Sequence, residues 1–436
     1  MRQPIHDETT ELLLASIYQK SGEGLQASFY YGKPGARHFE KNFGTEIYYI
    51  ENKLTRAALH VRQHGPSYLK YLAMSDIWSL LQKFVVENYW YLANDAFLRQ
   101  FDGSYADNIS ADAKRGFSQA LAISEIFQPQ SQLTIFPLVP IKVMADFDSD
   151  VFFLIKPLSL DATRLRTTIG AQEIASERFP PLIKFQGRQE SPSSWLGVRS
   201  PAVQASNKIK AAILGAIALT PLPRYRHSFS GRKLFGGRCT FSDGIVTSFG
   251  EAHTPPLMQD IIISEQDKRW LDILALKFES NEKATRRQIR ALEYFYRAWE
   301  LEPSERFPIL CMALDAIFGD VSSATKAVVD GVRSTLGSQL NESRLRHLME
   351  LRASVIHGGA PDVYDSSKYN SYYDDYEVDP IRDLELIVAG CLRTKIFDGT
   401  LRIHSDPNAK AIADAQARGI IPKNLSRNTI LEEGDQ

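Results

Sequence analysis

The 436-residue chain has only three cysteines, Cys239, Cys311 and Cys391, and they lie far apart in the sequence. This number and spacing exclude a disulfide-stapled scaffold, and no Cys-x-x-Cys pair or His/Cys cluster has the spacing of a zinc site. Separated cysteines are typical of a protein from a reducing compartment. We therefore expect a cytoplasmic protein that uses no metal or other cofactor.

Long hydrophobic runs and a strong net charge are also lacking. No segment approaches the ~18 apolar residues that a membrane-spanning helix needs, and the N-terminus resembles neither a signal peptide nor a transit peptide. The net charge is −1, so no overall positive field indicates nucleic acid, although a local basic surface is compatible with it. The composition, 44% apolar and 24% charged, is that of a globular protein. We expect no membrane association.

The hydrophobic pattern changes at about residue 262. Residues 1–160 predict an α+β domain, with strands at 28–33, 45–62, 132–147 and 149–160 and helices at 75–101 and 110–127, the latter capped by Ser110. Residues 161–262 are rich in proline and glycine and predict irregular β structure around one helix, 204–219. Residues 263–403 predict an all-α bundle with helices at 264–277, 284–300, 304–318, 323–336, 342–357 and 380–397. We expect residues 404–436 to form a polar, loosely held tail.

The predicted helix 342–357 carries an arginine in its apolar face. On a helical wheel, Arg352 falls in the middle of an arc formed by apolar side chains (Leu345, Leu348, Met349, Val355 and Ile356). Burial of an unpaired guanidinium is costly, so Arg352 should meet an acid, or this face should border a cleft or a second subunit. His357 follows about 140° around the helix and ~7.5 Å further along, where Gly358 and Gly359 end it. Ser354 lies on the same side as His357 and is placed to hydrogen-bond its ring.

The helical part resembles the HEPN domain, in particular the branch found in ApeA-like abortive-infection proteins. The resemblance covers about a third of the chain and rests on "ALEYFYRAWE" (291–300), "FPILCMALDAIFG" (307–319), "LMELRASVIHGG" (348–359) and the helix 380–397. The third segment matches the family signature, an arginine, four to six intervening residues and a histidine at a helix end. Ala353 departs from the family pattern, in which many members have Asn, Asp or His at that position.

The resemblance implies a metal-independent endoribonuclease whose active site forms between two protomers. Arg352 would bind the scissile phosphate, His357 would transfer a proton, and the products would carry 2′,3′-cyclic phosphate and 5′-hydroxyl ends. Asp315 is the candidate to hold Arg352, and Ser354 to support His357. We expect a homodimer or higher even oligomer that cleaves single-stranded regions of tRNA or mRNA as an effector of anti-phage defence. The N-terminal region would sense a trigger or position RNA.

Two further segments bear on RNA binding. Residues 223–238 combine aromatic side chains with basic ones, of which Arg224, Arg226, Arg232, Lys233 and Arg238 are RNA-binding candidates; a solvated basic loop is the alternative. Residues 361–379 contain six acids, one lysine and five tyrosines. We interpret them as a surface loop or as a gate that repels RNA from the site.

Two other functions remain open. Ala353 motivates the first, in which the helical part is a non-catalytic module that binds RNA or a protein. The second makes the N-terminal region an enzyme, since His60 and His64 would share a helix face and could bind a metal; no third ligand is evident nearby.

Overall fold

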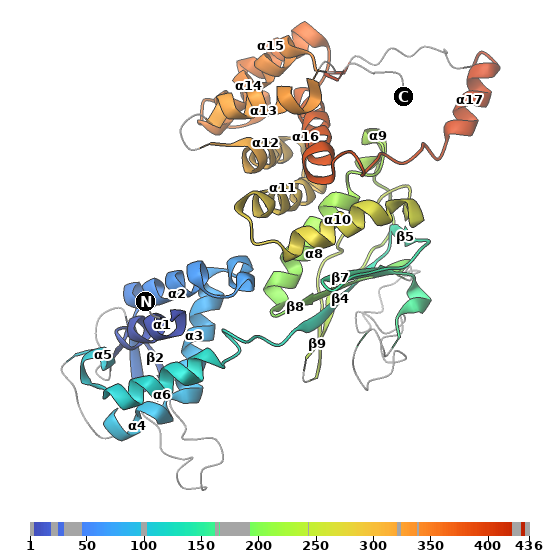
Figure 1. Ribbon diagram of the computed structural model, residues 1–436. Coiled ribbons are helices and arrows are strands. Elements are labelled where there is room, and N and C mark those ends of the chain that lie inside the picture. Colours follow the sequence, from blue (N-terminus) through green and yellow to red (C-terminus); the bar gives the residue numbers. More distant parts are fainter. Residues whose placement is uncertain are drawn as a thin grey trace. The chain divides into compact units, whose positions relative to one another are not determined.

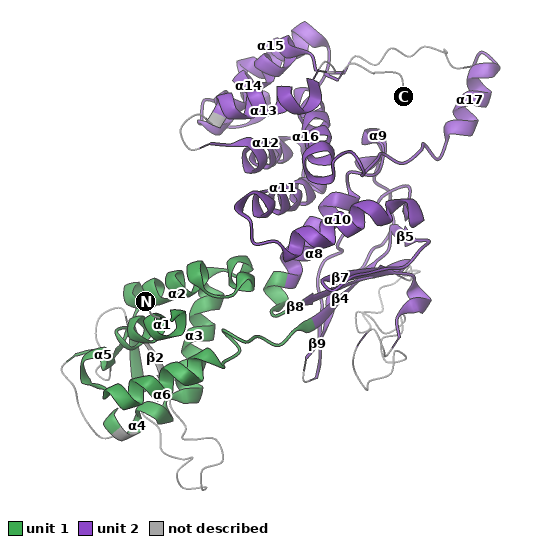
Figure 2. Ribbon diagram, viewed as in Figure 1, with its two compact units in different colours: residues 1–132, 200–205 green, residues 133–199, 206–436 purple. Residues whose placement is uncertain are grey.

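The protein is described from a computed structural model, which covers residues 4–18, 25–29, 46–96, 103–161, 165, 192–242, 244–320, 324–337, 340–420 and 429–431. The fold has a mixed α+β N-terminal half with an antiparallel sheet, followed by a mostly helical C-terminal region (Figure 1). This confirms the predicted fold class at that level. The chain forms two compact units, residues 1–132 with 200–205 and residues 133–199 with 206–436 (Figure 2).

Unit 1 packs helices around a small antiparallel sheet with the order β1-β3-β2. Its elements are α1 (Ile5–Leu14), β1 (Ile17–Tyr18), β2 (Leu25–Phe29), β3 (Glu46–Ile50), α2 (Glu51–His64), a 3-10 helix (Ser67–Tyr71), α3 (Met74–Asn88), α4 (Trp90–Ala96), α5 (Tyr105–Asn108) and α6 (Ala111–Ala122). Ser110 caps α6 as predicted, because its hydroxyl accepts a hydrogen bond from the Ala113 amide at 3.3 Å.

Two predictions for this unit are wrong. The predicted strand 45–62 ends at Ile50, and the rest is helix α2, whose buried Leu54, Ala57, Ala58 and Val61 follow helical spacing. The predicted single helix 75–101 is interrupted at Tyr89. That side chain is fully buried with its hydroxyl 2.6 Å from the Tyr105 hydroxyl. The end of that helix, 97–101, and most of the predicted strand 28–33 lie outside the described residues.

Unit 2 is built on a six-stranded antiparallel sheet in the order β10-β9-β4-β8-β7-β6. Its strands are β4 (Gln132–Leu138), β6 (Phe147–Asp148), β7 (Phe152–Ile155), β8 (Ser194–Ser200), β9 (Arg238–Phe241) and β10 (Ile245–Ser248); β5 (Ile141–Val143) pairs in parallel with β11 (Ile261–Ile263). A 3-10 helix (Pro157–Ser159) follows β7, and residues 162–164 and 166–191 of the predicted irregular segment are not described.

One face of this sheet carries the helices, so sheet and bundle share a core. Phe152 and Leu154 of β7 join the cluster of α8 (Val203–Ile217) and α10 (Lys268–Glu279), while Phe153 and Ile155 point to the other face. Figure 1 shows α8 and α10 lying along the sheet. The same cluster continues through the C-terminal helices. Packing in unit 2 is therefore continuous across residue 262, where the composition changes.

All six helices predicted in the C-terminal region are present. They are α10, α11 (Lys283–Trp299), α12 (Pro303–Phe318), α13 (Ala324–Leu336), α14 (Glu342–Ile356) and α16 (Pro380–Phe397). The unit also contains α9 (Pro223–Arg226), two 3-10 helices (Glu265–Asp267 and Val363–Asp365), α15 (Ser367–Tyr376) and α17 (Ala409–Ala417). Asp379 caps α16 by accepting from the Ile381 amide at 2.9 Å. Within the described ranges, no helix combines the length and apolar character needed to cross a bilayer.

Two expectations about loops are corrected. The acidic segment 361–379 is mostly helix α15, because Tyr372 turns inward and is fully buried. The tail is not loose throughout: α17 is helical and Ile430 is fully buried, with its carbonyl accepting from the Asn341 amide at 3.0 Å.

Candidate functional site

The site is built at the C-terminal end of α14, which closes in a Schellman motif. The Gly359 amide donates to the Ser354 carbonyl at 2.8 Å, and the Gly358 amide donates to the Val355 carbonyl at 3.2 Å. Gly358 has a φ of 76°, a conformation that glycine adopts without strain. The two glycines therefore stop the helix at His357, which is its capping residue.

Arg352 lies on the packed face of α14 and meets Asp315 of α12. Its side chain is 6% exposed, and its Nη2 lies 2.7 Å from each carboxylate oxygen of Asp315, whose own side chain is 36% exposed. The sequence predicted this partner. Two charge-assisted hydrogen bonds therefore hold the buried guanidinium of Arg352 against the more exposed carboxylate of Asp315.

The rest of the guanidinium is less fully satisfied. Nη1 donates to the Thr325 hydroxyl at 3.3 Å, while Nε is buried and, within the described residues, has no acceptor. Cys311 is also near, and burial raises the pKa of its thiol to about 12, so it stays protonated and inert as a nucleophile. The charge of Arg352 is thus balanced mainly by Asp315.

His357 and Ser354 do not form the predicted contact. The Ser354 hydroxyl lies 3.1 Å from the Ser366 hydroxyl instead, which ties the end of α14 to the start of α15. The side chain of His357 is exposed, and no described residue hydrogen-bonds to its ring. Ile356 beside it is 42% exposed, so the predicted apolar arc is left uncovered at this end.

A basic groove adjoins Asp315. Its volume is about 690 Å³, and its walls are α11 and α12, with Lys283, Arg286, Arg287, Arg290, Tyr294, Met312, Asp315 and Ala316 lining it. The four cations recur at spacings of three and four residues, which places them on one face of α11. Sequence reasoning missed this groove, although the spacing of the cations was visible in residues 283–290.

These cations differ in their partners. The Arg287 guanidinium binds carbonyl groups at the end of α12, including that of Ala316 at 2.7 Å. Arg290 pairs with Glu293 and lies 4.6 Å from the centre of the Tyr294 ring. Lys283 and Arg286 form no ion pair within the described residues. Two positive charges therefore remain for an anion in the groove.

The basic segment 223–238 is folded into unit 2 rather than extended as a loop. Arg226 is 1% exposed, pairs with Glu385, and donates through Nε to the Ala218 carbonyl at 2.8 Å. Burial alone would raise the pKa of Glu385, but Arg226 and His227 lower it to about 2. Arg226 is therefore a buried structural cation and not the surface RNA contact predicted for it.

The other four candidates of this segment lie nearer the surface. Arg224 pairs with Asp406, and Arg232 pairs with Asp260 at 2.5 Å. Lys233 is exposed, and Arg238 begins β9. Their RNA contacts stay a prediction, but two of the cations already have carboxylate partners.

Helix α15 is anchored against α14 by a buried polar cluster. Arg344 pairs with Asp383, and the Tyr372 hydroxyl donates to the same carboxylate at 2.6 Å. Burial and the negative Asp383 raise the pKa of Tyr372, so it remains a donor. A gate formed by this segment would have to break that cluster.

Metal ligation finds no further support in unit 1. His60 and His64 share a face of α2 with ring centres 4.9 Å apart, and His60 Nδ1 lies 3.7 Å from Glu8. Across the described ranges, no group of three or more His, Cys, Asp or Glu side chains is placed to hold a metal ion.

Comparison with known proteins finds no matching family model, no matching curated protein and no matching solved structure.

Proposed function

We propose that the helical C-terminal region is a metal-independent endoribonuclease of the HEPN type, acting on single-stranded regions of tRNA or mRNA in the cytoplasm as an effector of anti-phage defence. The observation that carries this proposal is the pair of residues at the end of α14: Arg352 held by Asp315 and His357 exposed at the helix cap.

His357 is suited to proton transfer. Its ring is exposed and no described residue hydrogen-bonds to it, so either nitrogen can approach the ribose 2′-hydroxyl or the leaving 5′-oxygen.

Arg352 is suited to bind the phosphate, which would take the place of the Asp315 carboxylate on its guanidinium. A carboxylate and a phosphate present similar pairs of oxygens to a guanidinium. Because Asp315 is 36% exposed at the edge of the groove, an RNA phosphate can compete for the outer side of the guanidinium. In this proposal RNA enters along the basic face of α11, where Lys283 and Arg286 contact its backbone.

A second protomer would complete the site. Ile356 is 42% exposed beside His357, and Met312 is 38% exposed in the wall of the groove. Apolar side chains at these two positions are compatible with a subunit contact that brings two copies of Arg352 and His357 together. The N-terminal unit would then sense a trigger or position RNA.

The test is cleavage of tRNA and mRNA by the purified full chain in the presence of a metal chelator. We expect cuts with 2′,3′-cyclic phosphate and 5′-hydroxyl ends. His357→Ala should lower the rate by about 10²–10⁴-fold, the range for loss of an acid–base group. His64→Ala, which removes an exposed histidine of unit 1, is the matched control and should cleave like the wild type.

End-mapping of RNA from cells that express wild type or His357→Ala would identify the target class as well. Equal cleavage by wild type, His357→Ala and Arg352→Ala would refute the proposal. Loss of cleavage in His64→Ala alone would instead favour an active site in unit 1.

A non-catalytic module is the second candidate, and one observation favours it. Arg352 is only 6% exposed in the single chain and its charge is balanced by Asp315, as expected of a structural arginine. RNA binding without cleavage, unchanged in His357→Ala, would support this function over the first.

A further inference from the structure

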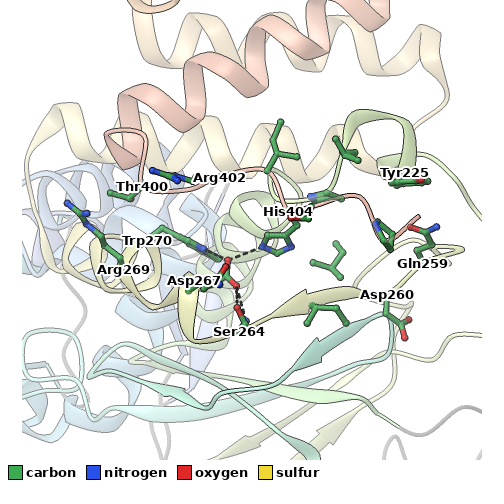
Figure 3. Close-up of a pocket in the computed structure, with 18 of the residues that line it drawn as sticks. Tyr225, Gln259, Asp260, Ser264, Asp267, Arg269, Trp270, Thr400, Arg402 and His404 are labelled. Atoms are coloured by element: carbon green, nitrogen blue, oxygen red, sulfur yellow. Dashed lines mark hydrogen bonds and ion pairs between the residues drawn. The ribbon is translucent and has the colours of Figure 1, made fainter. Parts of the chain in front are cut away.

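A second cavity of about 1070 Å³ lies in unit 2, away from the end of α14. It is lined by residues of α9, β11, the start of α10 and the segment that follows α16 (Figure 3). This volume is slightly above the range of about 300–1,000 Å³ that is typical of small-molecule sites. Its lining joins polar groups with the apolar side chains of Leu222, Leu257 and Ile261.

A fixed histidine–carboxylate pair lies in the cavity. His404 Nε2 lies 3.0 Å from Asp267 Oδ1, and this oxygen also accepts a hydrogen bond from the Trp270 indole at 2.9 Å. The other oxygen, Asp267 Oδ2, accepts from the Ser264 amide at 2.8 Å and from the Ser264 hydroxyl at 3.2 Å. Burial alone would raise the pKa of Asp267, but these donors lower it, so the carboxylate is charged.

This arrangement determines which nitrogen of His404 can meet a ligand. Asp267 accepts from Nε2, and no residue in the described ranges bonds to Nδ1. The backbone of His404 is held as well, because its amide donates to the Thr220 carbonyl at 2.7 Å. The ring is thus oriented from two sides, and its side chain remains 29% exposed. When the ring carries a second proton, Nδ1–H is a donor for an anion.

Two arginines add positive charge at one end of the cavity. Figure 3 shows Arg269 and Arg402 near Thr400, with His404 between them and the other end. Both arginines are exposed, and neither forms an ion pair within the part of the chain that is described.

The acids of the lining leave this charge largely uncancelled. Asp260 forms ion pairs with Lys142 at 2.6 Å and with Arg232 at 2.5 Å, and Asp267 pairs with His404. Asp398 is exposed and is the remaining carboxylate of the lining. A guanidinium fork matches the spacing of phosphate oxygens. The attraction of a phosphate to the two arginines therefore exceeds its repulsion by this single carboxylate.

The opposite end is suited to a flat polar group. Tyr225 and Gln259 lie there in Figure 3. The Tyr225 hydroxyl donates to Asp406 at 2.8 Å, which fixes the ring. The Gln259 amide offers both a donor and an acceptor, as recognition of a base edge requires.

We propose that this cavity binds a nucleoside phosphate, with its phosphates on Arg269, Arg402 and His404 and its base between Tyr225 and Gln259. The site is separate from the end of α14, and the proposal stands whether or not the chain cleaves RNA.

The test is calorimetric titration of the full chain with ATP, GTP, CTP and UTP, and with adenosine, without RNA or divalent cation. We expect at least one triphosphate to bind with a Kd below about 1 mM. The double variant Arg269→Gln/Arg402→Gln should weaken that binding roughly tenfold or more, because it removes both guanidinium forks. Adenosine, which lacks phosphate, should bind both proteins equally.

Arg418→Ala is the matched control, since Arg418 is an exposed arginine just after α17 and does not line the cavity. Its affinity should equal that of the wild type. Because Arg269 and Arg402 are exposed, their replacement should leave the fold intact, which hydrogen exchange of α10 and α16 would verify. The proposal is overturned if none of the four triphosphates binds below about 1 mM, or if the double variant binds them as tightly as the wild type.

Discussion

Replacing Asp315 by alanine removes the main partner of a buried charge. The Arg352 guanidinium would keep its bond to Thr325 but lose both carboxylate bonds, in a side chain that is 6% exposed. A buried cation without a counter-ion destabilises the packed face on which it lies. We therefore expect Asp315→Ala to loosen the contact between α12 and α14.

The magnitude follows from the exposure of the pair. Breaking a fully buried ion pair costs about 3–5 kcal/mol, but Asp315 is 36% exposed, so water can replace part of the carboxylate. We expect a loss of about 2 kcal/mol. Adding Arg352→Met to Asp315→Ala removes the charge and extends the apolar arc of α14. The double variant should recover about 1–2 kcal/mol of that loss.

The loss of stability is measured by hydrogen exchange of peptides from α12 and α14, read by mass spectrometry. A local measurement is needed because the chain has two compact units, so its unfolding need not be a single transition. Asp272→Ala is the control, because its pair with Lys268 lies on the surface, with side chains 52% and 56% exposed, and should contribute at most about 0.5 kcal/mol. If the double variant is as unstable as the sum of the two single variants, the charge of Arg352 is not what Asp315 compensates, and the reasoning is refuted.

Two further predictions concern the groove and a buried histidine. The double variant Lys283→Gln/Arg286→Gln should reduce the salt dependence of single-stranded RNA binding. The plot of log K against log salt has a negative slope, and its magnitude should fall by about 1.4 for two lost phosphate contacts. An unchanged slope in filter-binding assays would exclude the groove as the RNA-binding surface. Burial and then Lys210 lower the pKa of His253 from 6.5 to about 3, so the unfolded chain binds the proton first. Stability should therefore fall as the pH drops below about 6.5, on the order of 1–2 kcal/mol between pH 7 and 5. Urea unfolding at both pH values checks this. His253→Gln should remove the dependence, and a dependence that persists in this variant would contradict the assignment to His253.

Periodicity alone was enough to locate six helices of the C-terminal region, because most of them bury an apolar stripe and end at local signals. Asp379 at the N-terminus of α16 and Gly358 at the end of α14 act through neighbouring backbone groups, so a single sequence shows them. The pairing of Arg352 with an acid was predictable for a related reason. A charge in the middle of an apolar arc needs a partner, and Asp315 was the candidate on an adjoining helix.

The limits appear where burial depends on distant segments. Arg226 looked like a surface cation, but Glu385, 159 residues away, neutralises it in the interior. The acidic segment 361–379 looked like a loop, and it folds as α15 because Tyr372 reaches the buried Asp383.

What the sequence by itself determined is most of the local elements and the pair Arg352 and His357 on one helix. Only the tertiary structure decided that Ser354 bonds Ser366 rather than His357, and that the cations of α11 border Asp315. It also placed His404 against Asp267, from segments 137 residues apart. The physical reason is that helical spacing acts within a few residues, whereas charge pairing and cavities form between segments that only packing brings together.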